Sequence, residues 1–185
     1  DLRYYLIARL ALEQQISLVA TPNPGTLLKI AEAGVFHQDE LVRAIHDGVL
    51  FQNLPLPLEG EDKRILESIG SGIKPNRPRA RELEQFIRQS GKLLPSACWN
   101  SLNFVGCWLG GSAGFHAEKL TAYFGADVPK RDLGLLASEA SMTIPLEDGT
   151  AAGILALDNN YYEFMPTEGS FAANDPLPLC HELEI

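Results

Sequence analysis

The second half of the chain carries a strand, a glycine-rich turn, a helix and another strand in direct succession. The apolar run 102–109 precedes the turn Gly110-Gly111-Ser112, Ala117 and Leu120 have helical spacing, and a second apolar run spans 133–137. Apolar runs of this length beside glycine are consistent with buried strands. Two strands joined by a helix pair in parallel through a right-handed crossover. We therefore predict an α/β fold with a mixed, partly parallel sheet and flanking helices.

The first half of the chain has mainly helical patterns. Apolar residues at helical spacing predict a helix over about 2–14, and a short strand is expected at 16–20. A second helix is expected to end at Gly34. A third is expected to begin with Asp39 as its cap and to end at Gly48.

We expect a single α/β unit over residues 1–185, with a mainly helical half at 1–91 and a sheet-rich half at 92–185. Three further strands are predicted, at 141–146, 153–157 and 161–166. A short turn joins the first two, which predicts a hairpin. The chain begins inside a helical pattern and stops inside a strand pattern, so we expect it to be a fragment of a larger domain.

Acidic residues outnumber basic ones, with 24 Asp and Glu against 15 Lys and Arg and a net charge of −9. Binding to nucleic acid or to an anionic membrane needs clustered cations, so this composition argues against both. Arg77, Arg79 and Arg81 are expected at the solvated start of a helix. No run approaches ~18 apolar residues, so no transmembrane helix is expected. The three cysteines lack paired spacing and indicate reduced thiols in a cytoplasmic protein.

The glycine-rich turn at 110–114 is the first candidate site. Glycine lets a ligand approach the backbone, and the N–H groups at the helix start favour a negative or polar group. A tight connection that needs glycine for its geometry alone explains the same pattern. These residues also match G-x-S-x-G, the nucleophile elbow of serine hydrolases, with Asp158 or Asp175 and then His181 following along the chain. A serine hydrolase using Ser112 is therefore an alternative.

Carboxylates at two strand ends are the other candidates. Ser138-Glu139 closes the apolar run that starts at Gly134, and open α/β sheets bind ligands at such ends. A carboxylate beside a hydroxyl suits Mg²⁺ carried by a nucleotide, although a solvated Glu at the start of a loop has the same sequence. Glu163 alternates with Tyr162 and Phe164, so it points to the opposite face from both. That face either lines a pocket or meets water.

Taken in order, these motifs resemble one family. The segments that carry the resemblance are Cys107-Trp-Leu-Gly-Gly-Ser-Ala113, Val128-Pro129 with Gly134-Leu-Leu-Ala-Ser-Glu139, and Asn160-Tyr-Tyr-Glu-Phe-Met-Pro166. They look like the auxin-responsive Gretchen Hagen family of acyl-acid amido synthetases, in the adenylate-forming superfamily. Asn23-Pro24-Gly-Thr-Leu-Leu28 and Ala44-Ile-His-Asp-Gly48 resemble the family's helical segment. The resemblance implies a central fragment of the adenylating domain, part of the large N-terminal domain of an adenylate-forming enzyme.

The resemblance also implies a chemistry. The family activates a carboxylic acid with ATP and Mg²⁺, forms an acyl-adenylate and transfers the acyl group to an amino acid. The implied partners are therefore small-molecule acid and amino acid substrates, with no nucleic acid and no membrane. The full-length protein would be a ligase, and the fragment alone is expected to be inactive.

The family motifs imply roles for individual residues. The implied nucleotide-binding residues are Gly111, Ser112, Ala113, Leu136, Ala137, Ser138, Glu139 and Glu163, and the implied acyl-pocket residues are Trp108 and Gly110. Glu139 is implied as the catalytic residue and the metal ligand. Leu135 stands where superfamily members often carry a Tyr that stacks on adenine. This departure keeps a non-catalytic relative that serves as a binding module as a further alternative.

Overall fold

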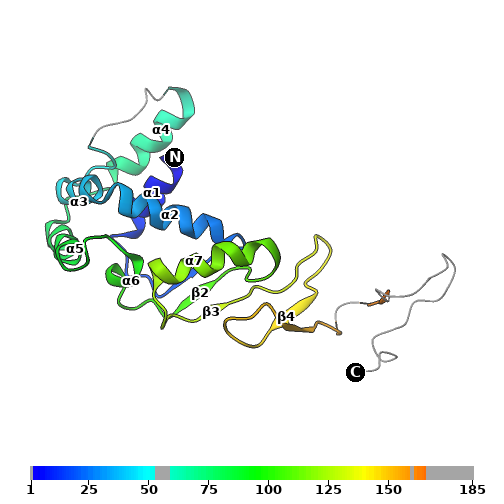
Figure 1. The fold of residues 1–185 in the computed structure, drawn as a ribbon. Helices are drawn as coiled ribbons and strands as arrows, with labels where there is room; N and C mark the ends of the chain where they lie inside the picture. Colours follow the sequence, from blue (N-terminus) through cyan, green and yellow to red (C-terminus); the bar gives the residue numbers. More distant parts are fainter. Residues whose placement is uncertain (1, 53–58, 159–160, 166–185) are drawn as a thin grey trace.

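The computed structural model describes residues 2–52, 59–158 and 161–165, which form a helical body, a small parallel sheet and a hairpin (Figure 1). The helical body lies at one end of the molecule and the hairpin at the other. The helices are α1 (Leu2–Ala11), α2 (Pro24–Phe36), α3 (Gln38–Asp47), α4 (Gly60–Ser71), α5 (Arg77–Ser90), α6 (Pro95–Cys98) and α7 (Gly114–Phe124). A single 3₁₀ turn, η1 (Gly111–Ala113), leads into α7.

Several helix ends follow the capping signals in the sequence. The side chain of Asn23 accepts a hydrogen bond from the Gly25 N–H at 2.8 Å, which fixes the start of α2. Gly48, with φ of 70°, closes α3 in the left-handed conformation that only glycine adopts readily, as predicted. Helix α1 also falls inside its predicted range.

Two predicted helix boundaries are wrong. Helix α2 continues through Gly34 to Phe36, because a single glycine in a buried helix costs only about 1 kcal/mol relative to alanine and does not stop it. Helix α3 begins at Gln38 with His37 as its flanking residue, so Asp39 lies in the first turn instead of at the cap. A carboxylate there still interacts favourably with the positive end of the helix dipole.

The parallel sheet has the strand order β1-β2-β3. Its strands are β1 (Leu18–Ala20), β2 (Phe104–Gly106) and β3 (Lys130–Arg131). Val105 in the central strand pairs with Val19 on one side and with Lys130 on the other. Helix α7 joins β2 to β3, so the predicted parallel strand–helix–strand connection is present, but with a different second strand, and α2 packs beside α7 (Figure 1).

The predicted strand at 133–137 is wrong. β3 ends at Arg131, and Gly134, with φ of 83°, turns the chain away from the sheet. Beyond this turn Leu135 and Leu136 are 64% and 46% exposed. The positive φ redirects the backbone toward the hairpin. The chain therefore leaves the sheet before Leu135 and Leu136, which do not pair with β2. The apolar run therefore lines a surface and not the core.

The predicted hairpin is confirmed as β4 (Thr143–Pro145) paired antiparallel with β5 (Gly153–Leu155). Ile144 lies opposite Ile154 in this ladder. The strand predicted at 161–166 is not found in its described part, 161–165, where Glu163 occupies an isolated bridge position. Residue 166 lies outside the described residues.

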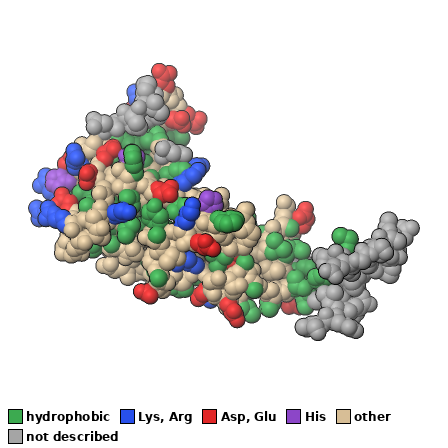
Figure 2. Space-filling view, viewed as in Figure 1, with side chains coloured by type: hydrophobic (Ala, Val, Ile, Leu, Met, Phe, Trp, Pro, Cys, Tyr) green, Lys and Arg blue, Asp and Glu red, His purple; other side chains and the backbone are tan. Residues whose placement is uncertain are grey.

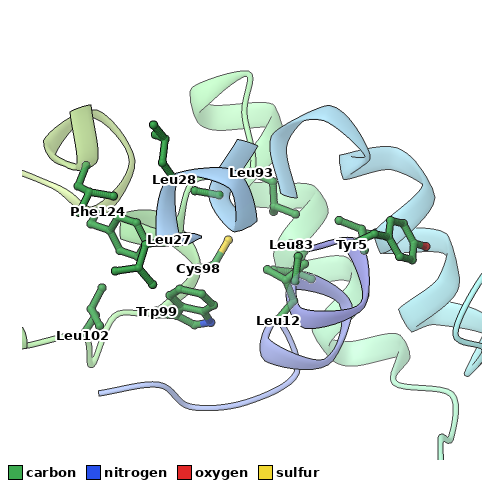
Figure 3. Packing of buried hydrophobic residues seen from close by; sticks show 14 of the residues in the cluster. Tyr5, Leu12, Leu27, Leu28, Leu83, Leu93, Cys98, Trp99, Leu102 and Phe124 are labelled. Carbon is green, nitrogen blue, oxygen red and sulfur yellow. The ribbon is translucent and has the colours of Figure 1, made fainter. Parts of the chain in front are cut away.

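The core lies where the helices meet one another and the sheet (Figure 3). Val105 of β2 is fully buried, and Leu120 and Phe124 of α7 are buried beside it. Trp99 lies against Phe124 with ring centroids 6.5 Å apart, and its indole N–H donates to the Ala11 carbonyl. Each such side chain contributes about 1.5–3 kcal/mol by leaving water.

A buried arginine links α5 to the rest of the helical body. The sequence predicts Arg79 on a solvated helix face, and this is wrong, because its side chain is only 9% exposed. Its guanidinium donates to the carbonyl oxygens of Leu12 and Cys98, both at 2.7 Å, and pairs with Glu82. Buried cations persist only when their donors are satisfied, and this network satisfies three of them.

None of the described helices is both long enough and apolar enough to cross a lipid bilayer.

Candidate functional site

A cleft of about 470 Å³ lies beyond the carboxyl ends of β2 and β3. One wall, which follows β2, consists of Trp108 and residues 110–113. The opposite wall, which follows β3, consists of Asp132 and residues 134–136, and Ala151 of the hairpin completes the lining. Parallel strands that end at one edge bring sequentially distant loops together, and ligands of open α/β sheets bind at this edge.

Asp132 joins the two walls at their base. It directly follows β3, is only 7% exposed and accepts two backbone hydrogen bonds at 2.6 Å, one from the Leu109 N–H and one from the Gly134 N–H. The indole N–H of Trp108 also donates across the cleft, to the Gly134 carbonyl at 3.0 Å. Asp132 is not among the residues predicted from the sequence. An acidic residue at the end of a parallel strand was the signal for it, but the strand was predicted three residues too late.

Two of the glycines in the cleft make contacts too close for a larger residue. A Cβ on Gly110 would lie 2.9 Å from the Ala151 Cβ, and one on Gly134 would lie 2.3 Å from the Thr143 carbonyl oxygen. Gly111 has φ of 55° and open space around it. The turn therefore needs glycine both for its backbone conformation and for the contact between its wall and the hairpin.

Six of the predicted site residues line this single cleft. They are Trp108, Gly110, Gly111, Ser112, Ala113 and Leu136. The other four, Ala137, Ser138, Glu139 and Glu163, are exposed and are not part of its lining. The Ala137 N–H donates to the Ala140 carbonyl at 2.9 Å, so residues 137–140 form a tight turn beyond the leucine wall.

Glu163 lies on a separate segment that packs on the hairpin. The Tyr162 hydroxyl donates to the Met142 carbonyl at 2.8 Å, and the Tyr162 and Phe164 rings stack with centroids 6.3 Å apart. Glu163 and Tyr161 are exposed on the opposite side, where their side chains lie 3.4 Å apart. The predicted alternation of Glu163 with its aromatic neighbours is present, and its carboxylate meets water in the described part of the chain.

The geometry around Ser112 gives little support to the hydrolase alternative. In a nucleophile elbow the serine itself occupies the sharp, strained turn. Here the positive φ falls on Gly111, and no described residue other than glycine has a positive φ. Asp158 is exposed, whereas Asp175 and His181 lie outside the described residues.

Cys107, just before the cleft wall, is fully buried. Burial, with the nearby Asp132 carboxylate as a further cause, raises the pKa of its thiol to about 11. The thiol is therefore neutral at physiological pH and is a poor nucleophile. Within 2–52, 59–158 and 161–165, no group of three or more His, Cys, Asp and Glu side chains is arranged to hold a metal ion.

Comparisons with known proteins point to one family. A model of the "GH3 family N-terminal domain" matches residues 1–129. A solved structure of "GH3.15 acyl acid amido synthetase" superposes with a TM-score of 0.60 at 16% identity, over 77% of this chain and 26% of that one. A second, "AtGH3.15 acyl acid amido synthetase in complex with 2,4-DB", gives 0.60 at 15% identity, over 77% and 25%. No curated protein matches the sequence. The chain spans about a quarter of the length of these two structures.

Proposed function

The chain belongs to the GH3 family, and we propose that it forms one side of the nucleotide and acyl site of an ATP-dependent acyl-acid amido synthetase. The observation that carries the proposal is the cleft beyond β2 and β3, which gathers six of the residues that the family motifs imply. Those residues come from two loops separated by a whole helix, and they meet at the sheet edge where α/β proteins bind nucleotides.

The proposed reaction has two steps in the complete protein. A carboxylate oxygen of the acid attacks the α-phosphorus of ATP, and the bond to pyrophosphate breaks. The amine of an amino acid then attacks the acyl carbon, the bond to AMP breaks, and an amide forms. Neither step needs a protein nucleophile, so the contribution of this chain is to orient the substrates and to stabilise charge.

The cleft is compatible with ATP in size and polarity. Its volume of about 470 Å³ lies within the range of about 300–1,000 Å³ typical of ligand sites. Residues 111–113 lead directly into the N-terminus of α7, whose N–H groups and dipole favour a negative or polar group. Leu135 and Leu136 provide an apolar wall opposite.

A nucleotide-bound Mg²⁺ would neutralise phosphate charge and usually needs only one or two protein carboxylates. Both oxygens of Asp132 already accept backbone hydrogen bonds. Glu139 is exposed a few residues beyond the leucine wall, so its carboxylate is available. We assign Glu139 as the metal ligand and catalytic residue, and Ala137 and Ser138 as its neighbours on the nucleotide side. Glu163 is assigned to the same side.

The test is ATP–pyrophosphate exchange by the full-length gene product across a panel of carboxylic acids. Acid-dependent exchange is expected with at least one of them. A folded protein that shows no exchange with any acid contradicts the proposal.

Replacing Glu139 tests its assignment. Glu139→Ala is expected to lower the exchange rate at least about tenfold, because charge stabilisation at the phosphates is lost. Glu147→Ala is the matched control, since Glu147 is an exposed carboxylate like Glu139 but lies in the hairpin turn, where the family motifs imply no role. An unchanged rate in Glu139→Ala removes this residue from the site.

A non-catalytic binding module is the second candidate, and Leu135 is the observation that favours it. Leu135 lines the cleft and is 64% exposed, and the family resemblance implies an aromatic ring at this position that would stack on adenine. Isothermal titration of the full-length protein with ATP and Mg²⁺ separates the two candidates. Measurable binding supports the synthetase, and its absence supports the module.

A further inference from the structure

The carboxylate of Asp132 is placed to control the shape of the cleft. It is almost fully buried, yet its two oxygens reach loops that belong to opposite walls. Oδ2 accepts from the N–H of Leu109, directly before the glycine-rich turn, and Oδ1 accepts from the N–H of Gly134, where the leucine wall begins.

Both contacts are strong ones. At 2.6 Å they are short for N–H···O hydrogen bonds, and bonds to an ionised acceptor are about twice as strong as neutral ones. Trp108 adds a weaker link, through its indole N–H to the Gly134 carbonyl at 3.0 Å. The two walls are therefore joined near Gly134 from two directions, and the carboxylate supplies the charged link.

We propose that Asp132 is a positioning residue that holds the glycine-rich turn and the leucine wall at the separation that the bound nucleotide requires. The bound nucleotide in this proposal rests on the proposed function, whereas the role of Asp132 in holding the two walls rests only on the observed hydrogen bonds. An amide in place of the carboxylate turns one acceptor into a donor that faces a backbone N–H, so one of the two links is lost and that N–H is left unpaired.

The variant Asp132→Asn in the full-length protein tests the proposal. The KM for ATP in pyrophosphate exchange is expected to rise at least about tenfold, with kcat changed less than about threefold, because misplaced walls weaken binding in the ground state and the transition state alike. Asp148→Asn is the matched control. It makes the same chemical change in a half-exposed carboxylate that pairs with Arg131 at 2.8 Å, outside the cleft, and it is expected to leave KM unchanged.

A second measurement reports the contact between the two walls in the absence of any ligand. The ¹⁹F resonance of 5-fluorotryptophan at position 108, assigned by its loss in Trp108→Phe, is expected to shift in Asp132→Asn and not in Asp148→Asn. A shifted resonance with an unchanged KM overturns the positioning role, and so does an unshifted resonance in a folded variant. If the wild type shows no ATP–pyrophosphate exchange with any acid, the proposed function fails. The ¹⁹F resonance alone then decides whether Asp132 holds the two walls in place.

A measurement on the wild type covers the case in which Asp132→Asn does not fold. Hydrogen–deuterium exchange at single-amide resolution is expected to show protection of both the Leu109 and the Gly134 amides, because each donates to the buried carboxylate. Rapid exchange of both amides overturns the proposal.

Discussion

The helical body of this chain contains a buried apolar core, whereas the hairpin end leaves its large apolar side chains exposed. In the body, helices α1, α2, α3, α5 and α7 bury their apolar faces against one another and against β2. In the hairpin, the large apolar side chains Ile144, Leu146 and Ile154 are 49%, 58% and 54% exposed. Figure 2 shows Lys and Arg side chains gathered over the α3 and α5 end, and hydrophobic side chains at the surface around β4 as well as over parts of the body. The body completes its own core, and the hairpin end does not.

The cleft lies at the junction between these two regions. Its glycine-rich wall follows β2 and leads into α7, whereas its leucine wall leads into the hairpin. The family match ends at residue 129, so it covers the body and the glycine-rich wall but stops before Asp132 and the leucine wall. The half of the site that is anchored in a packed core is also the half that the family comparison supports.

Truncating a core side chain of the body is expected to have the largest effect on stability. Phe124 is 2% exposed and packs against Trp99, so Phe124→Ala removes a buried ring and leaves a cavity. A loss of about 3–5 kcal/mol in the free energy of unfolding is expected, measured by urea denaturation. Phe115→Ala, at a position on the same helix that is 74% exposed, is the matched control. Equal losses in the two variants contradict a closed core in the body.

Removal of the buried Arg79 guanidinium is expected to rank next. Arg79→Met keeps the apolar stem but leaves the carbonyl oxygens of Leu12 and Cys98 without their donors. The expected cost is about 2–4 kcal/mol of unfolding free energy, because each unsatisfied buried acceptor costs about 1–3 kcal/mol. Arg81→Met, two residues along α5 at an exposed position, is expected to change stability by less than about 0.5 kcal/mol. Similar values for the two variants show that the network contributes nothing.

The elements that the sequence predicted correctly are those whose signals are local. In α7, Ala117, Leu120 and Phe124 recur at helical spacing, and all three are buried. Gly48 marks the end of α3 through its own backbone preference. The turn at 147–149, between two strand patterns, predicts the hairpin from local sequence as well. Periodicity, capping and turn chemistry act over a few residues, so one sequence suffices to detect them.

The errors have non-local causes. Leu135 and Leu136 have the composition of a buried strand, but pairing with β2 takes place at Lys130 and Arg131, and no local signal reports that choice. Arg79 resembles its exposed neighbours in sequence, and only the approach of two distant carbonyl groups makes its burial favourable. The partners of Asp132 lie 23 residues away and 2 residues away, so its role depends on a loop that tertiary structure brings into contact.

A substitution on the hairpin surface is expected to have the smallest effect and gives the sharpest test of the comparison. Ile154→Thr keeps β-branching and changes a side chain that is 54% exposed and faces Ile144 across the ladder. A loss below about 1 kcal/mol is expected, because surface substitutions rarely exceed that and cross-strand pairs contribute about 0.2–1 kcal/mol. Urea denaturation of the full-length protein measures it, with Ile45→Thr at a fully buried position of α3 as the contrast. A loss in Ile154→Thr as large as that in Ile45→Thr contradicts the exposed hairpin face. Such a loss would mean that Ile154 is buried in the full-length protein, so that the exposed hairpin face is a property of residues 1–185 alone.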